Sequence, residues 1–214
     1  DAAAMVGGIH ANSRAPVDFL HQNLLIQMNL MEAAHAHGVE RFLFLGSSCI
    51  YPKYAAQPIL ESAMLSGALE ETNIGYALAK ISGVIAVQSF RKQHGHKWIS
   101  AMPSNLYGPG DNYDPEKSHV LAAFIRRFHE AKIAGADRVT VWGTGAPLRE
   151  FLHADDLASA VVFLLEHYDA DAPVNVGSGQ ELPISALAAT VAEIVGFDGR
   201  IEYDASKPDG TPRK

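Results

Sequence analysis

Apolar residues recur at helical spacing in several long stretches of the chain, and residues that begin or end helices frame these stretches. Pro16 stands near the first turn of the longest stretch, and Gly38 follows its end. In a later stretch, Ala77, Ile81 and Val84 fall on one face, and Gly95 comes after the last turn. The pattern predicts helices over residues 14–39, 74–95, 120–135, 155–168 and 182–196.

Short apolar runs alternate with these helices and are typical of buried parallel strands. They lie at residues 41–46, 98–105, 138–143, 172–179 and 200–204, with a further short strand expected just before residue 155. Alternation of helix and strand predicts an α/β fold with a doubly wound parallel sheet. Ligands of such sheets bind at the carboxyl ends of the strands. Polar or thiol side chains follow two of the strands at that position: Ser47, Ser48, Cys49, Ser104 and Asn105.

The composition narrows the function classes. The 214 residues are 48% hydrophobic and carry 24 acidic against 17 basic side chains, so that the net charge is −7. No basic face is indicated, which argues against nucleic acid or an anionic membrane as a partner. No apolar stretch is long enough to cross a bilayer. A single cysteine excludes an internal disulfide framework and favours a reducing compartment, the cytoplasm.

Tyr76 and Lys80 are four residues apart on a predicted helix, so both side chains lie on one face. An ammonium near a phenol favours the phenolate, and we expect Lys80 to lower the pKa of Tyr76. The spacing alone favours an ordinary core or surface tyrosine. With Ser47 at the end of the preceding strand, an acid–base pair is favoured instead.

Several segments together make the chain similar to a known family. The segments are LGSSCIYP, YALAK, PSNLYGPGDNY, SHV, VTVWGTGAPLREFLHADDLA and KPDGTPRK. They resemble the GDP-L-fucose synthase family of the extended short-chain dehydrogenase/reductases, over nearly the whole chain. The resemblance implies a Rossmann-like fold, the cofactor NADP(H) and a GDP-sugar substrate. It implies 3,5-epimerisation and NADPH-dependent 4-keto reduction of GDP-4-keto-6-deoxy-D-mannose.

The resemblance also assigns catalytic roles. Ser47 and Tyr76 would hold the C4 oxygen, and Tyr76 would protonate it after hydride delivery. Lys80 would bind the nicotinamide ribose. Cys49 and His119 would form the epimerisation pair. Without the resemblance, Cys49 is read as a small buried hydrophobe and His119 as a helix-start residue capped by Ser118.

Cofactor and substrate positions follow from the same resemblance. The cofactor-binding residues would be Leu45, Gly46, Ser47, Ser48, Tyr76, Lys80, Pro103, Ser104, Asn105 and His119. The GDP-sugar would contact Arg127, Trp142, Arg149 and Asp209. The ordinary alternatives are a solvated Arg127, a core Trp142, and an Arg149 paired with Asp155 or Asp156. His35, His37, His94 and His96 are read as exposed, and no metal site is expected.

The chain departs from the family in one respect. It has no glycine-rich dinucleotide fingerprint, which in the family lies upstream of the matching region. We therefore expect an internal part of a longer protein that is inactive on its own. Two other functions stay open: another NAD(P)-dependent nucleotide-sugar epimerase or dehydratase, and a nucleotide-sugar binding module without catalysis.

The expected organisation has four segments. Residues 1–110 would belong to the NADP-binding domain, 111–150 mostly to a substrate-binding lobe, 151–178 to a returning Rossmann helix and strand, and 179–214 to an incomplete substrate lobe. The helices at 17–37 and 75–94 are expected to form a homodimer.

Overall fold

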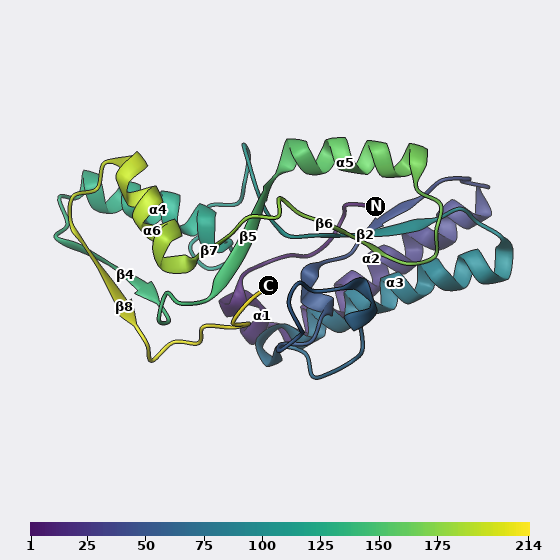
Figure 1. The fold of residues 1–214 in the computed structure, drawn as a ribbon, viewed down its shortest axis with the longest axis horizontal. Coiled ribbons are helices and arrows are strands. Elements are labelled where there is room, and N and C mark those ends of the chain that lie inside the picture. Colours follow the sequence, from purple (N-terminus) through teal and green to yellow (C-terminus); the bar gives the residue numbers. More distant parts are fainter.

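The computed structural model describes all 214 residues and is built around a parallel sheet with helices on both faces (Figure 1). Its strands are β1 (Leu43–Leu45), β2 (Ile99–Pro103) and β6 (Val174–Val176), with β2 in the centre. Leu43 is in register with Ile99, and Ala101 with Val174. The prediction of a parallel α/β sheet is confirmed.

Alternating side chains of β1 divide the core between the two faces of this sheet. Phe44 packs under helices α2 (Pro16–Ala36) and α3 (Ile74–His94) in a cluster that includes Val84 and Trp98. Leu43 points to the other face, where it meets Leu164 of helix α5 (Ala154–His167). Figure 1 shows α5 on one side of the sheet and α2 and α3 on the other. The strand is therefore buried on both faces, as its continuous apolar run predicts.

The helix boundaries follow the chemistry of their end residues. Pro16 occupies the first turn of α2, where its missing N–H costs no helical hydrogen bond. Gly95 ends α3 in the left-handed conformation, with φ of 73°, which glycine adopts without strain. In mid-helix, Gly83 lets α3 approach β1, because a Cβ at this position would lie 2.3 Å from Phe44 Cζ.

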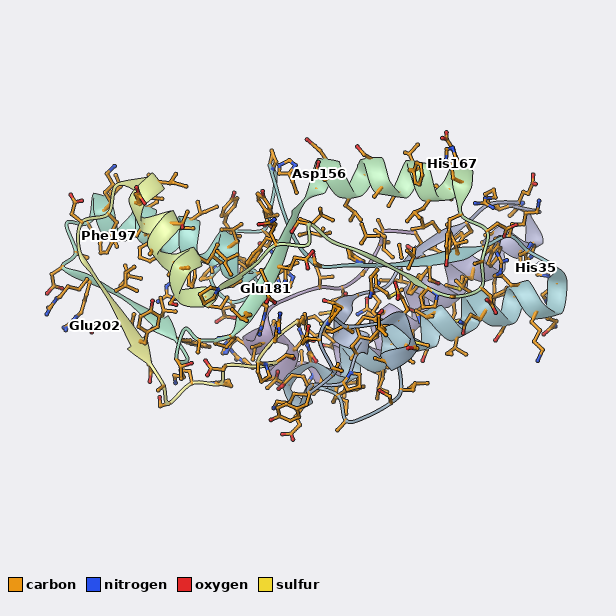
Figure 2. All side chains as sticks on the ribbon, in the orientation of Figure 1. His35, Asp156, His167, Glu181, Phe197 and Glu202 are labelled. Atoms are coloured by element: carbon orange, nitrogen blue, oxygen red, sulfur yellow. The ribbon has the colours of Figure 1, made fainter.

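A second group of elements lies at the opposite end of the molecule. Helices α4 (Val120–Ile133) and α6 (Ile184–Val195) pack on the parallel pair β4 (Arg138–Trp142) and β8 (Arg200–Asp204). Phe128, Val141 and Val191 belong to its separate hydrophobic core. Figure 2 shows Phe197 at this end and His35 at the other, so the two cores lie apart along the long axis.

Three strands join the two ends. β3 (Asn105–Tyr107) runs parallel to β5 (Leu148–His153), and β5 pairs antiparallel with β7 (Glu181–Pro183). The expected single strand over 98–105 is therefore wrong: the chain leaves the main sheet at Ser104 and enters the second sheet at Asn105. The Asn105 side chain supports this change by donating to the backbone oxygen of Glu150 at 2.9 Å.

Two elements were not predicted. Helix α1 (Ile9–Arg14) lies in a segment for which no element is predicted, and its six residues are too few for a clear periodic signal. Strand β7 falls in a segment read as the start of a helix. None of the helices combines the length and the apolar character that a membrane crossing needs.

Candidate active site

The carboxyl end of β1 turns sharply and presents the hydroxyl of Ser47 beside the thiol of Cys49. Gly46 N–H donates to the Ala101 oxygen at 2.9 Å, which continues the pairing with β2 by one residue. The chain then enters the short 3₁₀ turn Ser48–Ile50, which Ser47 caps by accepting from the Cys49 N–H at 3.2 Å. The small polar residues after this strand are thus brought to one place by a capped turn.

Helix α3 brings Tyr76 and Lys80 to the same strand end. Lys80 is 4% exposed, and its Nζ donates to the Leu45 oxygen at 2.8 Å. The ammonium lies 5.9 Å from the centre of the Tyr76 ring and 4.8 Å from that of Phe44. Burial lowers the pKa of Lys80 to about 8. At neutral pH most Lys80 side chains therefore stay protonated, although the proton is lost more easily than from an exposed lysine.

The expectation that Lys80 lowers the pKa of Tyr76 is wrong for this structure. Burial raises the pKa of Tyr76, the nearby Cys49 thiolate raises it further, and the Ser47 hydroxyl opposes both. Lys80 has little effect because its ammonium is held by the Leu45 carbonyl rather than by the phenol. Tyr76 is consequently a protonated hydrogen-bond donor at neutral pH.

Cys49 stands where two nitrogen donors converge on its sulfur. Lys214 Nζ lies 3.0 Å from Sγ, and Asn73 Nδ2 lies 3.4 Å from it. Burial by itself raises the pKa of Cys49, but Lys214, Ser47 and the more distant Arg149 outweigh it and lower the pKa overall. The thiol is therefore not the inert buried hydrophobe of the ordinary reading, because a thiolate is stabilised here.

His119 lies at the start of α4, where its backbone occupies the cap position without a side-chain cap. Ser118 accordingly does not cap it, and that part of the ordinary reading is wrong. Burial lowers the pKa of His119, and the Lys214 ammonium lowers it further, while Asp111 raises it. The Lys214 ammonium thus lowers the pKa of both His119 and Cys49, which keeps the imidazole neutral and favours the thiolate.

The residues expected along the cofactor occupy the ends of β1 and β2. Pro103 ends β2, and the next backbone N–H, that of Ser104, donates to the Val176 oxygen at 3.0 Å. The Ser104 hydroxyl is buried and has no hydrogen-bond partner in the protein. An unsatisfied buried hydroxyl is costly, so a ligand that supplies a partner would be favoured there. Together with the Lys80 ammonium, this donor set fits a ribose and carboxamide such as those of a nicotinamide nucleotide.

Arg149 and Asp209 come together although they are distant in sequence. Arg149 Nη2 donates to the backbone oxygen of Asp209 at 3.4 Å. The Asp209 carboxylate accepts from the Thr144 N–H at 2.7 Å and from the Thr144 hydroxyl at 2.8 Å. Burial lowers the pKa of Arg149, while Cys49 and Asp209 raise it. The suggested pairing of Arg149 with Asp155 or Asp156 is wrong, because the guanidinium instead donates to the backbone oxygens of Leu148 and Asp209.

The residues 205–214 form a strap that returns from β8 to the thiol. Leu148 N–H donates to the Pro212 oxygen at 2.9 Å, and Arg213 makes an ion pair with Glu181 of β7. Asp209 lies in the middle of this strap and Lys214 at its end. The strap therefore carries both Asp209, an expected substrate contact, and Lys214, which donates to the Cys49 sulfur.

Arg127 and Trp142 lie together in the α4–β4 region and apart from the strand ends of the main sheet. Arg127 Nη2 donates to the Thr140 oxygen, and Trp142 lies two residues further along β4. Trp142 is 47% exposed, so the core alternative is wrong. Lys207 Nζ lies 5.5 Å from the centre of the Trp142 ring. The exposed ring and the adjacent cations suit a base and phosphate groups.

Two residues of the site were missed from the sequence. Asn73 lies just before the predicted helix 74–95 and was assigned no role, and Lys214 was only the last residue of a predicted loop. Neither position carries a pattern that would identify it, because both reach Cys49 through chain turns that only the fold defines. With Cys49 they line a small cavity whose other residues are Ser48, Tyr51, Pro52, Ile59, Glu70 and Thr211.

The histidines contradict their expected exposure in part. His35 and His96 are half-buried, and His35 Nδ1 lies 2.7 Å from His96 Nε2. His94 stacks near His35 at 4.2 Å between ring centres, while the ring of His96 stacks on Trp98 at 4.4 Å. No set of three His, Cys, Asp or Glu side chains has an arrangement that could hold a metal ion.

Comparisons with known proteins point to one group of enzymes. Residues 1–177 match the model of the NAD dependent epimerase/dehydratase family. The chain is 62% identical to GDP-L-fucose synthase 1 of Arabidopsis thaliana over 213 residues, which is 100% of this chain and 66% of that protein. It is 51% identical to GDP-L-fucose synthase of Escherichia coli K12, covering 100% of this chain and 69% of that protein.

A solved structure agrees with these relatives. It is that of a GDP-L-fucose synthetase from Naegleria fowleri bound to NADP, with a TM-score of 0.87 at 27% identity. The match covers 99% of this chain and 65% of the other. The chain spans about two thirds of the length of these relatives.

Proposed function

The chain belongs to the NAD dependent epimerase/dehydratase family, and on that premise we propose that it carries the catalytic residues of a GDP-L-fucose synthase. The reaction converts GDP-4-keto-6-deoxy-D-mannose to GDP-L-fucose by epimerisation at C3 and C5 and reduction at C4. One observation carries the proposal: a thiol with a lowered pKa lies at the same strand end as the Ser47 and Tyr76 hydroxyls. A simple keto reductase needs the hydroxyls but has no use for the thiolate.

Epimerisation is assigned to Cys49 and His119. The protons at C3 and C5 are acidic because the C4 carbonyl adjoins both carbons, and removal of either gives an enolate. The Cys49 thiolate, which Lys214 and Asn73 stabilise, would take or return a proton on one face of the sugar. His119, with its pKa lowered by burial, would exchange the proton on the other face. Ser47 and Tyr76 would donate hydrogen bonds to the enolate oxygen.

Reduction at C4 uses the same two hydroxyls. NADPH, when bound, supplies the hydride. Tyr76 then gives its proton to the C4 oxygen, a role that its raised pKa suits because the phenol stays protonated until the oxyanion forms. Lys80 Nζ uses one N–H on the Leu45 carbonyl, which leaves others for the ribose hydroxyls of the cofactor. Ser104 would satisfy its unpartnered hydroxyl on the same cofactor.

The GDP-sugar is assigned to the second group of elements. Arg127 and Arg149 would neutralise the diphosphate, Trp142 would face the base or ribose, and Asp209 would accept from hydroxyls. This division keeps the expected organisation, in which 111–150 and 179–214 bind substrate and the rest holds the cofactor. Arg149 supports it, because its pKa responds both to Cys49 and to Asp209.

A homodimer in the cytoplasm completes the proposal. Apolar side chains stay exposed along α2 and α3, among them Val17 at 73% and Leu25 at 45%. Such a surface on two adjacent helices would be covered if two copies packed as a helix bundle. A reactive thiol without a disulfide partner fits a reducing compartment.

Separating the two half-reactions tests the proposal. Cys49→Ser should lose most deuterium incorporation from heavy water at C3 or C5, because a serine hydroxyl is too weak an acid at neutral pH. Hydride transfer to the keto sugar should be less affected. Unchanged deuterium incorporation in Cys49→Ser would favour another nucleotide-sugar epimerase or dehydratase. Absence of any NADPH oxidation in the unsubstituted full-length parent protein would favour a binding module.

A further inference from the structure

The turn that enters α3 holds a buried carboxylate that the proposed mechanism does not use. Glu70 is 6% exposed and caps the 3₁₀ turn Glu71–Asn73, with its Oε1 accepting from the Thr72 N–H at 3.3 Å. Its backbone oxygen accepts from the Asn73 N–H, also at 3.3 Å. Side chain and backbone of one residue therefore fix the shape of this turn.

Lys53 pairs with the buried charge, and the more distant Arg149 also interacts with it. Lys53 Nζ lies 2.9 Å from Glu70 Oε2, and the side chain of Lys53 is 25% exposed against 8% for Glu70. Lys53 comes four residues after Cys49, and its backbone N–H donates to the Ala68 oxygen at 2.9 Å. The ion pair thus connects the segment that leaves the thiol to the turn that enters the catalytic helix.

Asn73 is the last residue of that turn, and its amide reaches the Cys49 sulfur at 3.4 Å. We propose that Glu70 is a positioning residue that, through the turn 71–73 and with Lys53, keeps the Asn73 amide on the Cys49 sulfur. The inference deepens the proposed function, because it concerns the thiol that would move protons at C3 and C5. Glu70 acts through Asn73 rather than on the substrate.

When Glu70 is replaced, loss of its charge and loss of its positioning role should shift the pKa of Cys49 in opposite directions. Removing a nearby negative charge would by itself favour the Cys49 thiolate. Loss of the turn geometry would instead remove the Asn73 N–H from the sulfur and disfavour the thiolate. Loss of a hydrogen bond to a charged group disfavours the charged form by about tenfold or more, so it should slow a thiolate reaction at pH 7 by at least that order. The direction of the change therefore identifies the mechanism.

Alkylation of Cys49 by iodoacetamide as a function of pH measures this directly and needs no substrate. Mass spectrometry of the peptide that contains Cys49 follows this one thiol. Glu70→Gln breaks the ion pair with Lys53 and leaves only a weaker, neutral acceptor for the Thr72 N–H, so the turn is held less firmly. It should move the midpoint pH of alkylation upward and slow the reaction at pH 7 on the order of tenfold. The rate at the high-pH plateau should stay the same. A midpoint that stays fixed or moves down in Glu70→Gln overturns the proposal.

Two double variants separate charge from position. Lys53→Met with Glu70→Gln removes both charges at once, so a purely electrostatic role predicts no shift, whereas positioning predicts the same upward shift. In an Asn73→Ala background, Glu70→Gln should cause no further upward shift of the midpoint, because the two residues act through one contact. An additive effect of Glu70→Gln in that background contradicts the inference.

A matched ion pair elsewhere serves as control. Asp169 pairs with Arg91 at 2.8 Å, far from the thiol, and Asp169→Asn should leave the alkylation profile unchanged. Deuterium exchange into the keto sugar is measured in parallel. If the alkylation shift is found but the unsubstituted full-length parent protein exchanges no deuterium, the positioning role stands and the proposed function fails.

Discussion

Replacement of Gly83 by alanine should loosen the contact between α3 and β1 on which the site depends. The added Cβ would lie 2.3 Å from Phe44 Cζ, 2.5 Å from Phe44 Cε1 and 3.0 Å from Gln27 Oε1. Phe44 is fully buried, so its ring has no solvent side toward which to move. Either the ring leaves its rotamer or the helix moves away from the strand.

The size of the effect follows from two opposing contributions. Overpacking of a buried site costs about 1–3 kcal/mol. Alanine in place of glycine within a helix returns about 0.5–1 kcal/mol through reduced backbone entropy of the unfolded chain. We therefore expect Gly83→Ala to lower the free energy of unfolding by about 1–2 kcal/mol. Because Lys80 lies one turn earlier and is bonded to Leu45, a shift of the helix should also reduce catalysis in molecules that remain folded.

Urea unfolding followed by tryptophan fluorescence measures the stability of Gly83→Ala, since Trp98 lies in the same core as Phe44. Ser82→Ala, at an exposed position next to it on the helix, is the control and should change stability by less than about 0.5 kcal/mol. Phe44→Leu should relieve the clash, so that the double variant loses less than the sum of the single losses. A Gly83→Ala protein as stable as the parent would refute the steric argument.

The remaining predictions concern the titrating groups. Tyr76→Phe should keep the fold and slow reduction of the keto sugar by roughly 10²–10⁴-fold in a stopped-flow assay of NADPH oxidation, and a rate near that of the parent would count against the proton-donor role. Lys80→Met should abolish reduction yet raise the free energy of unfolding by about 1–2 kcal/mol, because a buried ammonium is removed. The pKa of Lys80 is lowered from 10.5 in the unfolded chain to about 8 in the folded protein, so between these pH values only the unfolded chain keeps the proton. The free energy of unfolding of the parent should therefore rise with pH across this window, whereas that of Lys80→Met should not. Burial, His35 and His94 lower the pKa of His96 from 6.5, so its contribution to stability is present above pH 6.5 and is lost on acidification below it; thermal melts of His96→Gln should show a weaker acid dependence than those of the parent.

Most of the main sheet and its helices can be predicted from the sequence, because the periodic patterns of apolar residues are strong there. Phe42 to Leu45 form an unbroken apolar run, and Pro16 and Gly95 mark helix ends by backbone chemistry that depends on no distant contact. The position of Ser47 and Cys49 at a strand end follows from the same local patterns. These features are local, and a single chain suffices to recognise them.

The parts that escaped prediction depend on contacts between distant residues. Lys214 reaches Cys49 across 165 positions, and no periodicity announces such a contact. The pKa of Tyr76 is raised, not lowered as expected, mainly because the phenol is buried. The spacing places Lys80 on the same helix face but does not show that its ammonium donates to the Leu45 carbonyl. The strand break at Ser104 is of the same kind, because it depends on where β5 lies.

The strap 205–214 gives the protein a particular constraint on how its specificity can change. Asp209 and Lys214 lie five residues apart on one segment, which Pro212 and Arg213 fasten to β5 and β7. An insertion or deletion within this segment would alter the reach of the lysine to the thiol as well as the contacts of the aspartate. Under the proposed function, engineering toward another sugar nucleotide should therefore begin with substitutions that preserve the length of the strap, because variants with altered loop length should lose substrate contacts and thiol reactivity together.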